Sequence, residues 1–254
     1  MSAVHDELYL PRRSPVHALA PEAKIVASFG FVAMVAITPR RAVWAFAVYA
    51  TVVVVGYLVA KLGPVVMLRR MSVALPFMTA AGFVPFVAGG PTVEVAGVAL
   101  ATEGLWGSWN IVAKAGIGAA TSGLLASTTP IPDIIRGLGR LGVPATITAI
   151  ITFMFRYLEV IVGEMGRMRV AMTSRGHDPR WLWQAKPIAS AAGALFIRSY
   201  ERGERVHAAM LARGFTGRMP EMGRRRASAS DWAAAIGVVV TAAAVAATSI
   251  LGAR

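Results

Sequence analysis

The sequence contains no cysteine, and only 15% of its 254 residues are charged. Without cysteine there can be no disulfide bonds and no thiolate chemistry. Soluble globular domains carry about 25% charged residues, so the low charge content excludes an ordinary soluble domain. The chain is instead 56% hydrophobic, with a mean hydropathy of +0.59. These values are typical of an α-helical protein that crosses a membrane several times.

Sequence motifs for catalysis and for resident cofactors are also missing. No Gly-x-x-x-x-Gly-Lys-Ser/Thr loop occurs, so we expect no ATP site of the P-loop type in this chain. The four histidines show no His-x-x-His or His-x-x-x-His spacing, which argues against a metal site. No Ser/His/Asp arrangement is readable either. We therefore expect no catalytic residue, no metal and no cofactor in this chain, and no enzymatic activity.

Acidic residues are scarce relative to basic ones, and the net charge is +13. Sixteen of the 26 basic residues lie between residues 133 and 226, together with seven acidic ones. Lys and Arg accumulate in the cytoplasmic loops of membrane proteins, so this excess indicates topology and not binding to nucleic acid. A basic cytoplasmic region can also bind an acidic partner protein or the headgroups of membrane lipids.

Five apolar segments are candidates for membrane spans, each of which needs about 20 residues. We expect a cytoplasmic tail over residues 1–22, four transmembrane helices within residues 23–128, and a final transmembrane helix within residues 231–254. The four expected spans of the first group are 23–38, 42–60, 71–90 and 105–128. The fold class expected is an all-α protein of the cell membrane, with the N-terminus in the cytoplasm.

Charged and proline residues add detail to this topology. Arg69 and Arg70 are expected at a cytoplasmic turn, and the prolines of the third span are expected to kink it. Arg40 and Arg41 then lie on the outer side, against the positive-inside tendency. Lys114 is the one charge in the fourth span. Such a charge is a functional candidate, although a Lys near the outer edge usually extends toward the lipid headgroups.

Residues 129–230 are expected to form a cytoplasmic region. Within it, residues 143–162 are apolar enough to span, but they contain Arg156 and Glu159 and have basic flanks on both sides. A crossing here would place one strongly basic loop outside the cell. We predict instead a long helix that lies along the inner leaflet. A second long amphipathic helix is expected over residues 188–214.

Two similar hexapeptides occur in this region, 38 residues apart. They read Ala171-Met172-Thr173-Ser174-Arg175-Gly176 and Ala209-Met210-Leu211-Ala212-Arg213-Gly214. An Arg precedes each by four residues, so Arg167 and Arg205 share a helical face with the motif Arg. Each motif ends in Gly, which readily terminates a helix in the left-handed conformation. The spacing of Arg156, Glu159, Glu164 and Arg167 also favours ion pairs along one helix.

The paired Ala-Arg-Gly motifs resemble the coupling helices of the transmembrane T component of energy-coupling factor (ECF) transporters. The stretch from Phe155-Arg156-Tyr157-Leu158-Glu159 to Gly176 is similar to the cobalt/nickel branch, the Q-type permease, as is the opening Ser14–Lys24. The first motif departs from the pattern only by Ser174 in place of Ala.

The resemblance implies a non-catalytic scaffold with several partners. Two ABC ATPases would bind ATP and Mg and receive Arg175 and Arg213, and a small membrane S subunit would bind the solute, a cobalt or nickel ion or a vitamin. Helix support would come from Arg156, Glu159, Glu164, Arg167 and Arg205. The residues expected to contact the ATPases are Arg175, Gly176, Arg213, Gly214, Ala171, Met172, Ala209, Met210 and Ala212.

Two other classes of function stay open at the level of sequence. A self-contained ion channel or carrier would bind or conduct solute without ATPases, but few polar residues line the expected spans. An intramembrane enzyme would use Lys114, Arg156 and Glu159, and would be active as a single purified chain. The coupling scaffold is the hypothesis that the motifs favour.

Overall fold

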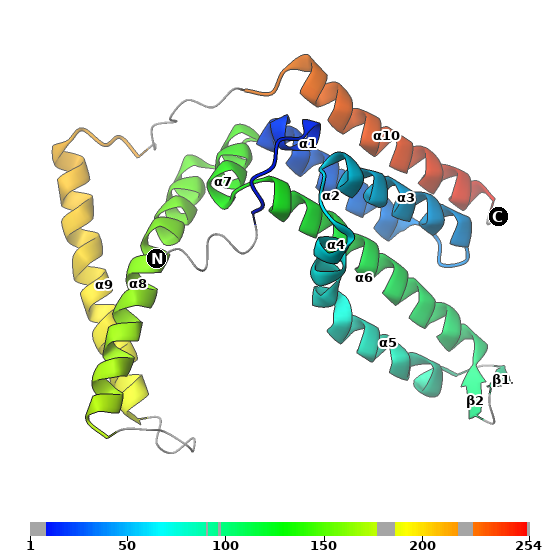
Figure 1. Ribbon diagram of the computed structural model, residues 1–254, viewed down its shortest axis with the longest axis horizontal. Helices are drawn as coiled ribbons and strands as arrows, with labels where there is room; N and C mark the ends of the chain where they lie inside the picture. Colours follow the sequence, from blue (N-terminus) through cyan, green and yellow to red (C-terminus); the bar gives the residue numbers. More distant parts are fainter. Residues whose placement is uncertain (1–8, 90, 96–97, 177–185, 218–225, 253–254) are drawn as a thin grey trace. The chain divides into compact units, whose positions relative to one another are not determined.

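The computed structural model describes residues 9–89, 91–95, 98–176, 186–217 and 226–252 (Figure 1). It divides into two compact units, and each is described by itself. The bundle unit comprises Ala3–Gly137 and Arg224–Arg254, and the helix-pair unit comprises Leu138–Gly223. Of the tail expected over residues 1–22, residues 1–8 lie outside the described part, as do residues 177–185 after the first motif.

Helices dominate both units, and the predicted fold class of an all-α membrane protein is confirmed. In the described part of the chain, one antiparallel pair of short strands interrupts them, with Thr92 opposite Ala101. The bundle unit holds, in chain order, α1 (Pro15–Ala18), α2 (Pro21–Ile37), α3 (Val43–Val59), α4 (Pro64–Met71), the 3-10 helix η1 (Ser72–Ala74), α5 (Leu75–Val87), β1 (Thr92–Val95), β2 (Val98–Ala101), α6 (Thr102–Thr128), α7 (Ile131–Arg140) and α10 (Ala229–Leu251). The α7 helix runs on into the helix-pair unit.

Among the residues that the structure describes, four helical stretches are long and apolar enough to cross a membrane. They are Pro64–Val87, Thr102–Thr128, Ala145–Ser174 and Ala229–Leu251, and the shorter α3 is also apolar. The chain is therefore a multi-pass membrane protein. Length and composition alone place Ala145–Ser174 in this group, although the sequence favours a position along the membrane for its first half.

The expected turn at Arg69 and Arg70 is wrong. Both residues lie in the last turn of α4, where cations are favoured by the helix dipole. The turn lies earlier, at residues 60–63, and Pro64 then starts α4 because its fixed φ suits the first helical position. The third span is interrupted at η1, just before α5. Pro76 lies in the first turn of α5, where a proline removes no helical hydrogen bond, so Pro76 itself does not break a helix.

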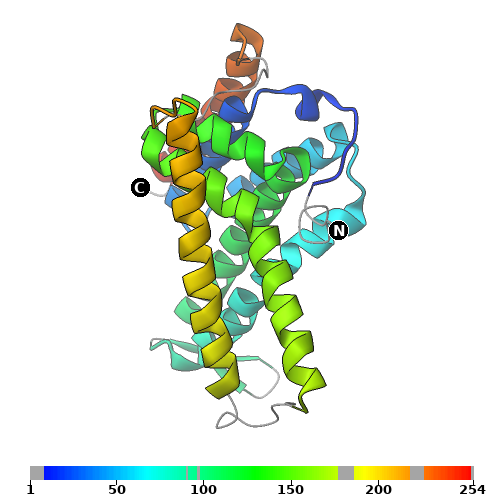
Figure 2. The ribbon, with the colours of Figure 1, turned by 90° about the vertical axis from the view of Figure 1, so that its left-hand side faces the viewer.

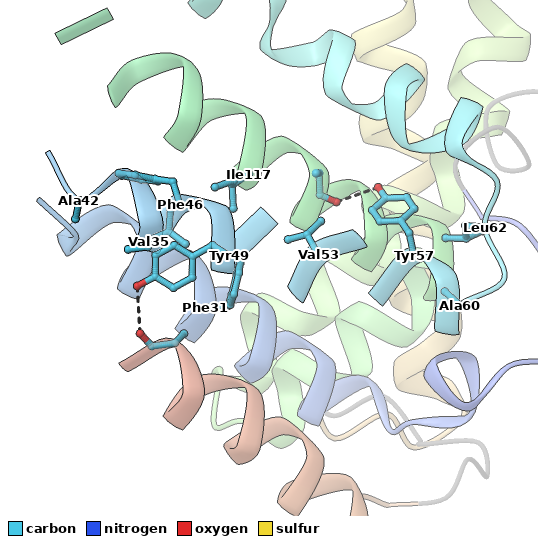
Figure 3. Close-up of a cluster of buried hydrophobic side chains, with 13 residues drawn as sticks. Phe31, Val35, Ala42, Phe46, Tyr49, Val53, Tyr57, Ala60, Leu62 and Ile117 are labelled. Atoms are coloured by element: carbon cyan, nitrogen blue, oxygen red, sulfur yellow. Dashed lines mark hydrogen bonds between the residues drawn. The ribbon is translucent and has the colours of Figure 1, made fainter. Parts of the chain in front are cut away.

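The core of the bundle unit is an aromatic cluster on α2 and α3 (Figure 3). The ring of Tyr49 is fully buried and packs edge-on against Phe31, with ring centres 5.6 Å apart. Its hydroxyl donates to the carbonyl oxygen of Ala242 at 3.2 Å, which ties α3 to α10. Tyr57, two turns further along α3, donates to the carbonyl oxygen of Ala120 in α6 at 3.0 Å. Buried hydroxyls therefore satisfy their hydrogen bonds while their rings fill the core.

Small residues on α6 allow close helix packing. A Cβ at Gly123 would lie 2.5 Å from the Cβ of Arg70 and 2.9 Å from the hydroxyl of Tyr57. No side chain fits there without movement of α4. Gly123 therefore brings α3 and α4 against α6.

The two arginines that violate the positive-inside tendency are both paired with one carboxylate. Arg40 and Arg41, between α2 and α3, bind Glu103 at 2.5 and 3.1 Å. Glu103 lies in the first turn of α6, where a negative charge is favoured by the helix dipole. This end of the bundle unit thus carries less net positive charge than the pair of arginines suggests.

The helix-pair unit consists mainly of two long antiparallel helices, α8 (Ala145–Ser174) and α9 (Lys186–Ala212) (Figures 1 and 2). The Glu164 carboxylate on α8 bridges to Arg198 on α9 at 2.8 Å. No residue of either helix is buried. Large apolar side chains such as Met154 and Phe196 are 67% and 72% exposed, so these helices present apolar surface that the rest of their unit does not cover.

Candidate functional site

The first motif ends α8 with its Arg as the capping residue. Ser174 is the last helical residue, and the amide of Arg175 donates to the carbonyl oxygen of Met172 at 3.1 Å. Gly176 follows with a φ of +78°, and its amide donates to the carbonyl oxygen of Thr173 at 2.9 Å. The predicted glycine stop is confirmed. Its left-handed conformation satisfies helix-terminal carbonyl groups that would otherwise lack a donor.

The second motif ends α9 in the same way. Gly214 has a φ of +80°, and its amide donates to the carbonyl oxygen of Leu211 at 2.9 Å. The amide of Phe215 reaches back to the carbonyl oxygen of Met210 at 3.0 Å. These two bonds make a Schellman motif, in which Arg213 is the residue between the last helical position and the left-handed Gly. The sequence repeat is thus also a repeat of local structure.

Both arginines lie on open helix ends. Arg175 and Arg213 are exposed, and within the described ranges neither guanidinium belongs to an ion pair. The alanines of the motifs (Ala171, Ala209 and Ala212) are exposed as well, whereas Met172 and Met210 are partly buried. A cation at a helix C-terminus is favoured by the helix dipole, so each Arg is compatible with its position without a partner.

The two helix ends do not converge. Because α8 and α9 are antiparallel (Figure 1), their C-terminal ends lie at opposite ends of the pair, and Arg175 and Arg213 directly follow these ends. At 1.5 Å per residue, the 27 residues of α9 separate them by about 40 Å. A single small ligand cannot bind both, so the arrangement fits two similar binding events at separate places.

One predicted support group is present, and it has a member that the sequence did not indicate. Glu164 binds Arg167 at 2.6 Å, as the helical spacing predicts, and also binds Arg198 at 2.8 Å. Arg205 lies 3.9 Å from Glu201. Arg198 could not be identified in advance, because a contact between two helices depends on their register and not on local spacing.

The remaining support candidates lie on the open surface of α8. Arg156 and Glu159 are both exposed. Glu159 has an interaction partner in the structure. The supporting role of these side chains stays a prediction.

A cavity of about 370 Å³ lies between the two long helices. Its walls are mostly apolar, with Phe153, Tyr157 and Ile161 on α8 and Leu195 and Met210 on α9. Volumes of 300 to 1,000 Å³ with apolar walls are usual for ligand and partner sites. Met210 belongs to the second motif, so one residue of that motif lines the cavity.

Lys114 has a structural partner in the bundle unit. Its ammonium group donates to the carbonyl oxygen of Ala36 at 2.8 Å. Ala36 lies in the last turn of α2, where carbonyl groups lack an intrahelical donor. This charge therefore caps α2 from α6.

No set of three or more His, Asp or Glu side chains converges as a metal site within the described part of the chain. The expected absence of a resident metal and of catalytic residues stays a prediction.

Comparison with known proteins identifies a family. Residues 12–222 match the model of the CbiQ family, described as "Cobalt transport protein". The matched range includes both motifs and all of α8 and α9.

Curated relatives point in the same direction. The cobalt transport protein CbiQ of Rhodobacter capsulatus is 30% identical over 155 residues, which are 61% of this chain and 62% of that protein. The energy-coupling factor transporter transmembrane protein EcfT of Brevibacillus brevis is 28% identical over 228 residues, 82% of this chain and 83% of that protein. EcfT of Staphylococcus aureus is 26% identical over 226 residues, 82% of each. The chain thus spans somewhat less than two thirds of the first of these relatives and more than four fifths of the others.

Proposed function

The chain belongs to the CbiQ family of cobalt transport proteins, as a transmembrane component of the energy-coupling factor type, and from this premise we propose that it couples two ATPase subunits to a separate solute-binding membrane subunit. The ATPases hydrolyse ATP, and this chain itself performs no catalysis. The transported solute would be a metal ion, as the cobalt transport relatives suggest. The complex would lie in the cell membrane, with the N-terminus of this chain in the cytoplasm.

The observation that carries the proposal is the structural repeat at the helix ends. Arg175 and Arg213 occupy the same capping position, each beside a left-handed Gly, about 40 Å apart at the two ends of an antiparallel pair. Two equivalent sites at that spacing fit two equivalent partners. A pair of ATPases that act as a dimer is such a partner, because each presents the same groove.

The chemistry of arginine suits this role. A guanidinium group forms two parallel hydrogen bonds with a carboxylate, and it is more weakly hydrated than an ammonium group. Exposed and unpaired within the described residues, each Arg is free to enter an acidic groove on an ATPase. The Gly that follows keeps the chain from adding further helix that would block the approach.

Both ends can serve one pair of ATPases only if the helix pair lies along the membrane. If α8 crossed the bilayer, its antiparallel partner would place Arg175 and Arg213 on opposite sides. Crossing would also bury Arg156 and Glu159, at about 2.5 to 3.5 kcal/mol for each such charge near the centre of a membrane helix. Lying along the inner leaflet keeps these charges in water while the apolar faces meet lipid or protein.

The exposed apolar surface of α8 and α9 is the proposed contact for the solute-binding subunit. Phe196, Ile197 and Met154 are 72%, 58% and 67% exposed. Patches of this kind on a folded protein mark contacts with other proteins or with the membrane. A displacement of the helix pair by the ATPases would then move the bound subunit.

Replacement of both arginines by alanine tests this function. In the complete complex reconstituted in vesicles, Arg175→Ala with Arg213→Ala should lower solute uptake at least about tenfold, since truncation of an arginine anchor in a protein interface typically removes 2 kcal/mol or more. The matched control is Arg169→Ala, an exposed arginine of α8 outside the motif. Arg→Lys at both motif positions should restore little, because Lys keeps the charge and loses the bidentate contact.

Protein level in the membrane is measured for each variant, so that failed insertion is recognised. The proposal is contradicted if the double alanine variant takes up as much solute as Arg169→Ala does.

A further inference from the structure

The first turn of α2 contacts the N-terminal segment, the end of α6, α7 and the segment before α10. It begins at Pro21 and holds two charged side chains that are almost fully buried, Glu22 at 4% and Lys24 at 7% exposure. Such side chains are rarely buried unless they are hydrogen-bonded or paired. Neither belongs to the arginine motifs, and the proposed coupling role does not by itself require them.

Lys24 joins this turn to the end of α6. Its ammonium group donates to the carbonyl oxygen of Thr128 at 3.1 Å and to the hydroxyl of Thr129 at 3.2 Å. It also reaches the carbonyl oxygen of His17 in the N-terminal segment at 3.4 Å. Thr128 is the last residue of α6, so its carbonyl group lacks an intrahelical donor and lies at the negative end of the helix dipole.

The chain then leaves the bundle unit beside the same turn. After Thr129 it enters α7, and the bundle unit ends at Gly137. A Cβ at Gly137 would lie 2.8 Å from the Cδ1 of Ile25 and 3.1 Å from the backbone nitrogen of Glu22. The last bundle residue of α7 is therefore in direct contact with the first turn of α2.

The chain also returns to the bundle unit at this turn. The bundle unit resumes at residue 224, and the backbone amide of Ala227 donates to the Oε1 atom of Glu22 at 2.8 Å. Asp231 then forms a capping box with Ser228 and starts α10. Glu22, which accepts the hydrogen bond from Ala227, is thus two residues from Lys24, which donates to Thr128 and Thr129.

We propose that the first turn of α2, Pro21–Ile25, is the anchor at which both connections of the helix-pair unit are fixed to the bundle unit, with Glu22 and Lys24 as the positioning residues. The residues that this turn binds are distant in sequence: Ala227 is 205 residues from Glu22, and Thr128 is 104 residues from Lys24. A single helical turn nevertheless binds both. Movement of the chain at Gly137 or at Ala227 is then passed to α2 and α6 at this turn. The part of this inference that concerns transmission rests on the proposed coupling function.

Hydrogen exchange of the purified full chain in lipid nanodiscs tests the anchor itself. Glu22→Ala should raise the exchange rate of the amide of Ala227 at least about tenfold, because this amide then loses its hydrogen bond to a charged acceptor. Glu22→Gln should retain part of the protection, since its amide oxygen still accepts a hydrogen bond. If Glu22→Ala fails to fold, Glu22→Gln alone must exchange faster than the parent chain at this position.

Glu103→Ala is the matched control, because Glu103 also accepts from the bundle unit's own residues but lies at the other end of α6. Exchange at Ala227 should be unchanged in this variant. The anchor is contradicted if Glu22→Ala exchanges there like the parent chain, or if Glu103→Ala accelerates that exchange equally.

Transmission is measured separately in the assembled complex. Glu22→Ala and Lys24→Met should lower the amount of solute imported per ATP hydrolysed by several-fold, with ATP hydrolysis retained, and Glu22→Gln should lie between Glu22→Ala and the parent chain. An unchanged ratio in Glu22→Ala overturns the transmission part. Uptake that survives loss of Arg175 and Arg213 would refute the coupling function and leave the exchange result standing, so the two failures are distinguishable.

Discussion

The imidazole of His17 lies between two oxygen atoms of its own segment. Its Nε2 atom is 3.1 Å from the carbonyl oxygen of Leu10, and its Nδ1 atom is 2.7 Å from the hydroxyl of Ser14. A carbonyl oxygen only accepts, so Nε2 carries the proton and Nδ1 accepts from Ser14 in the neutral ring. Burial lowers the pKa of His17 below 6.5; the hydrogen bond to Leu10 opposes that shift in part, and the positive charges of Lys24 and Arg12 add to it.

This shift predicts a loss of stability in mild acid. Because the folded-state pKa lies below the unfolded-state value of about 6.5, the unfolded chain binds the proton more readily. The contribution of His17 to stability is complete above pH 6.5 and is lost as the pH falls from there through the lower folded-state pKa. Thermal unfolding of the purified chain between pH 7.5 and pH 5 measures it.

His17→Gln is the control, because it removes the titration and retains polar groups. The melting temperature of this variant should fall less steeply with acid than that of the parent chain. Parallel curves for the two proteins would show that His17 does not contribute to the pH dependence.

At the scale of residues, the sequence predicts what depends on local spacing. The repeat identifies Arg175 and Arg213 and their glycine stops, and i, i+3 spacing identifies the contact of Glu164 with Arg167. It cannot predict that Glu22 receives an amide 205 residues away. Such contacts depend on how the helices pack, and no local pattern encodes that.

Each long helix of the helix-pair unit ends because a glycine takes a left-handed conformation. In this conformation a residue with a Cβ raises the energy of the folded chain by about 1 to 2 kcal/mol, since the Cβ approaches the following carbonyl oxygen. Gly176 and Gly214 therefore mark the ends of α8 and α9, and each follows directly after the motif Arg. The same residue type has no such role inside α9, where Gly193 has helical geometry and open space around it.

Gly214→Ala should reduce uptake by the complete complex about 5- to 30-fold, the equivalent of 1 to 2 kcal/mol of strain at the helix end. Gly193→Ala is the matched control, because alanine favours the helix interior and an added Cβ meets no atom within 4 Å. Gly193→Ala should transport like the parent chain. Equal transport by the two variants would contradict a role for the helix end.

At the scale of elements, an apolar segment predicts that a helix is present better than it predicts where the helix begins and ends. The sequence predicts the final span within 231–254 and the fourth at 105–128, and α10 and α6 cover Ala229–Leu251 and Thr102–Thr128. The predicted start of the third span is wrong: the charges of Arg69 and Arg70 indicate a turn, but both residues lie within α4. Side chains of arginine can lie along a helix end near the membrane surface, so charge alone does not mark a loop.

The whole molecule combines a bundle unit with its own core and a helix pair that has no buried residue. A helix pair of this kind needs lipid or partner proteins to cover its apolar faces. The sequence could predict the presence of these two parts, because charge is concentrated in one of them. It could not predict that the two arginine ends lie at opposite ends of an antiparallel pair, since that follows from the contact between α8 and α9.

Everything in the coupling account depends on both arginine ends facing the cytoplasm. The chain has no cysteine, so a single introduced thiol reports one position without ambiguity. Thr173→Cys places a thiol on an exposed residue within the first motif, Thr216→Cys places one on an exposed residue two positions after the second, and Gly89→Cys places one on the expected outer side. Each variant is exposed to a membrane-impermeant maleimide in intact cells and in inverted vesicles.

The account predicts that the thiols at positions 173 and 216 react only in inverted vesicles, and that the thiol at position 89 reacts only in intact cells. Both motif positions would then lie on the cytoplasmic side, with α8 along the membrane. Labelling of positions 173 and 216 from opposite sides would mean that α8 crosses the bilayer, and it would contradict the coupling function.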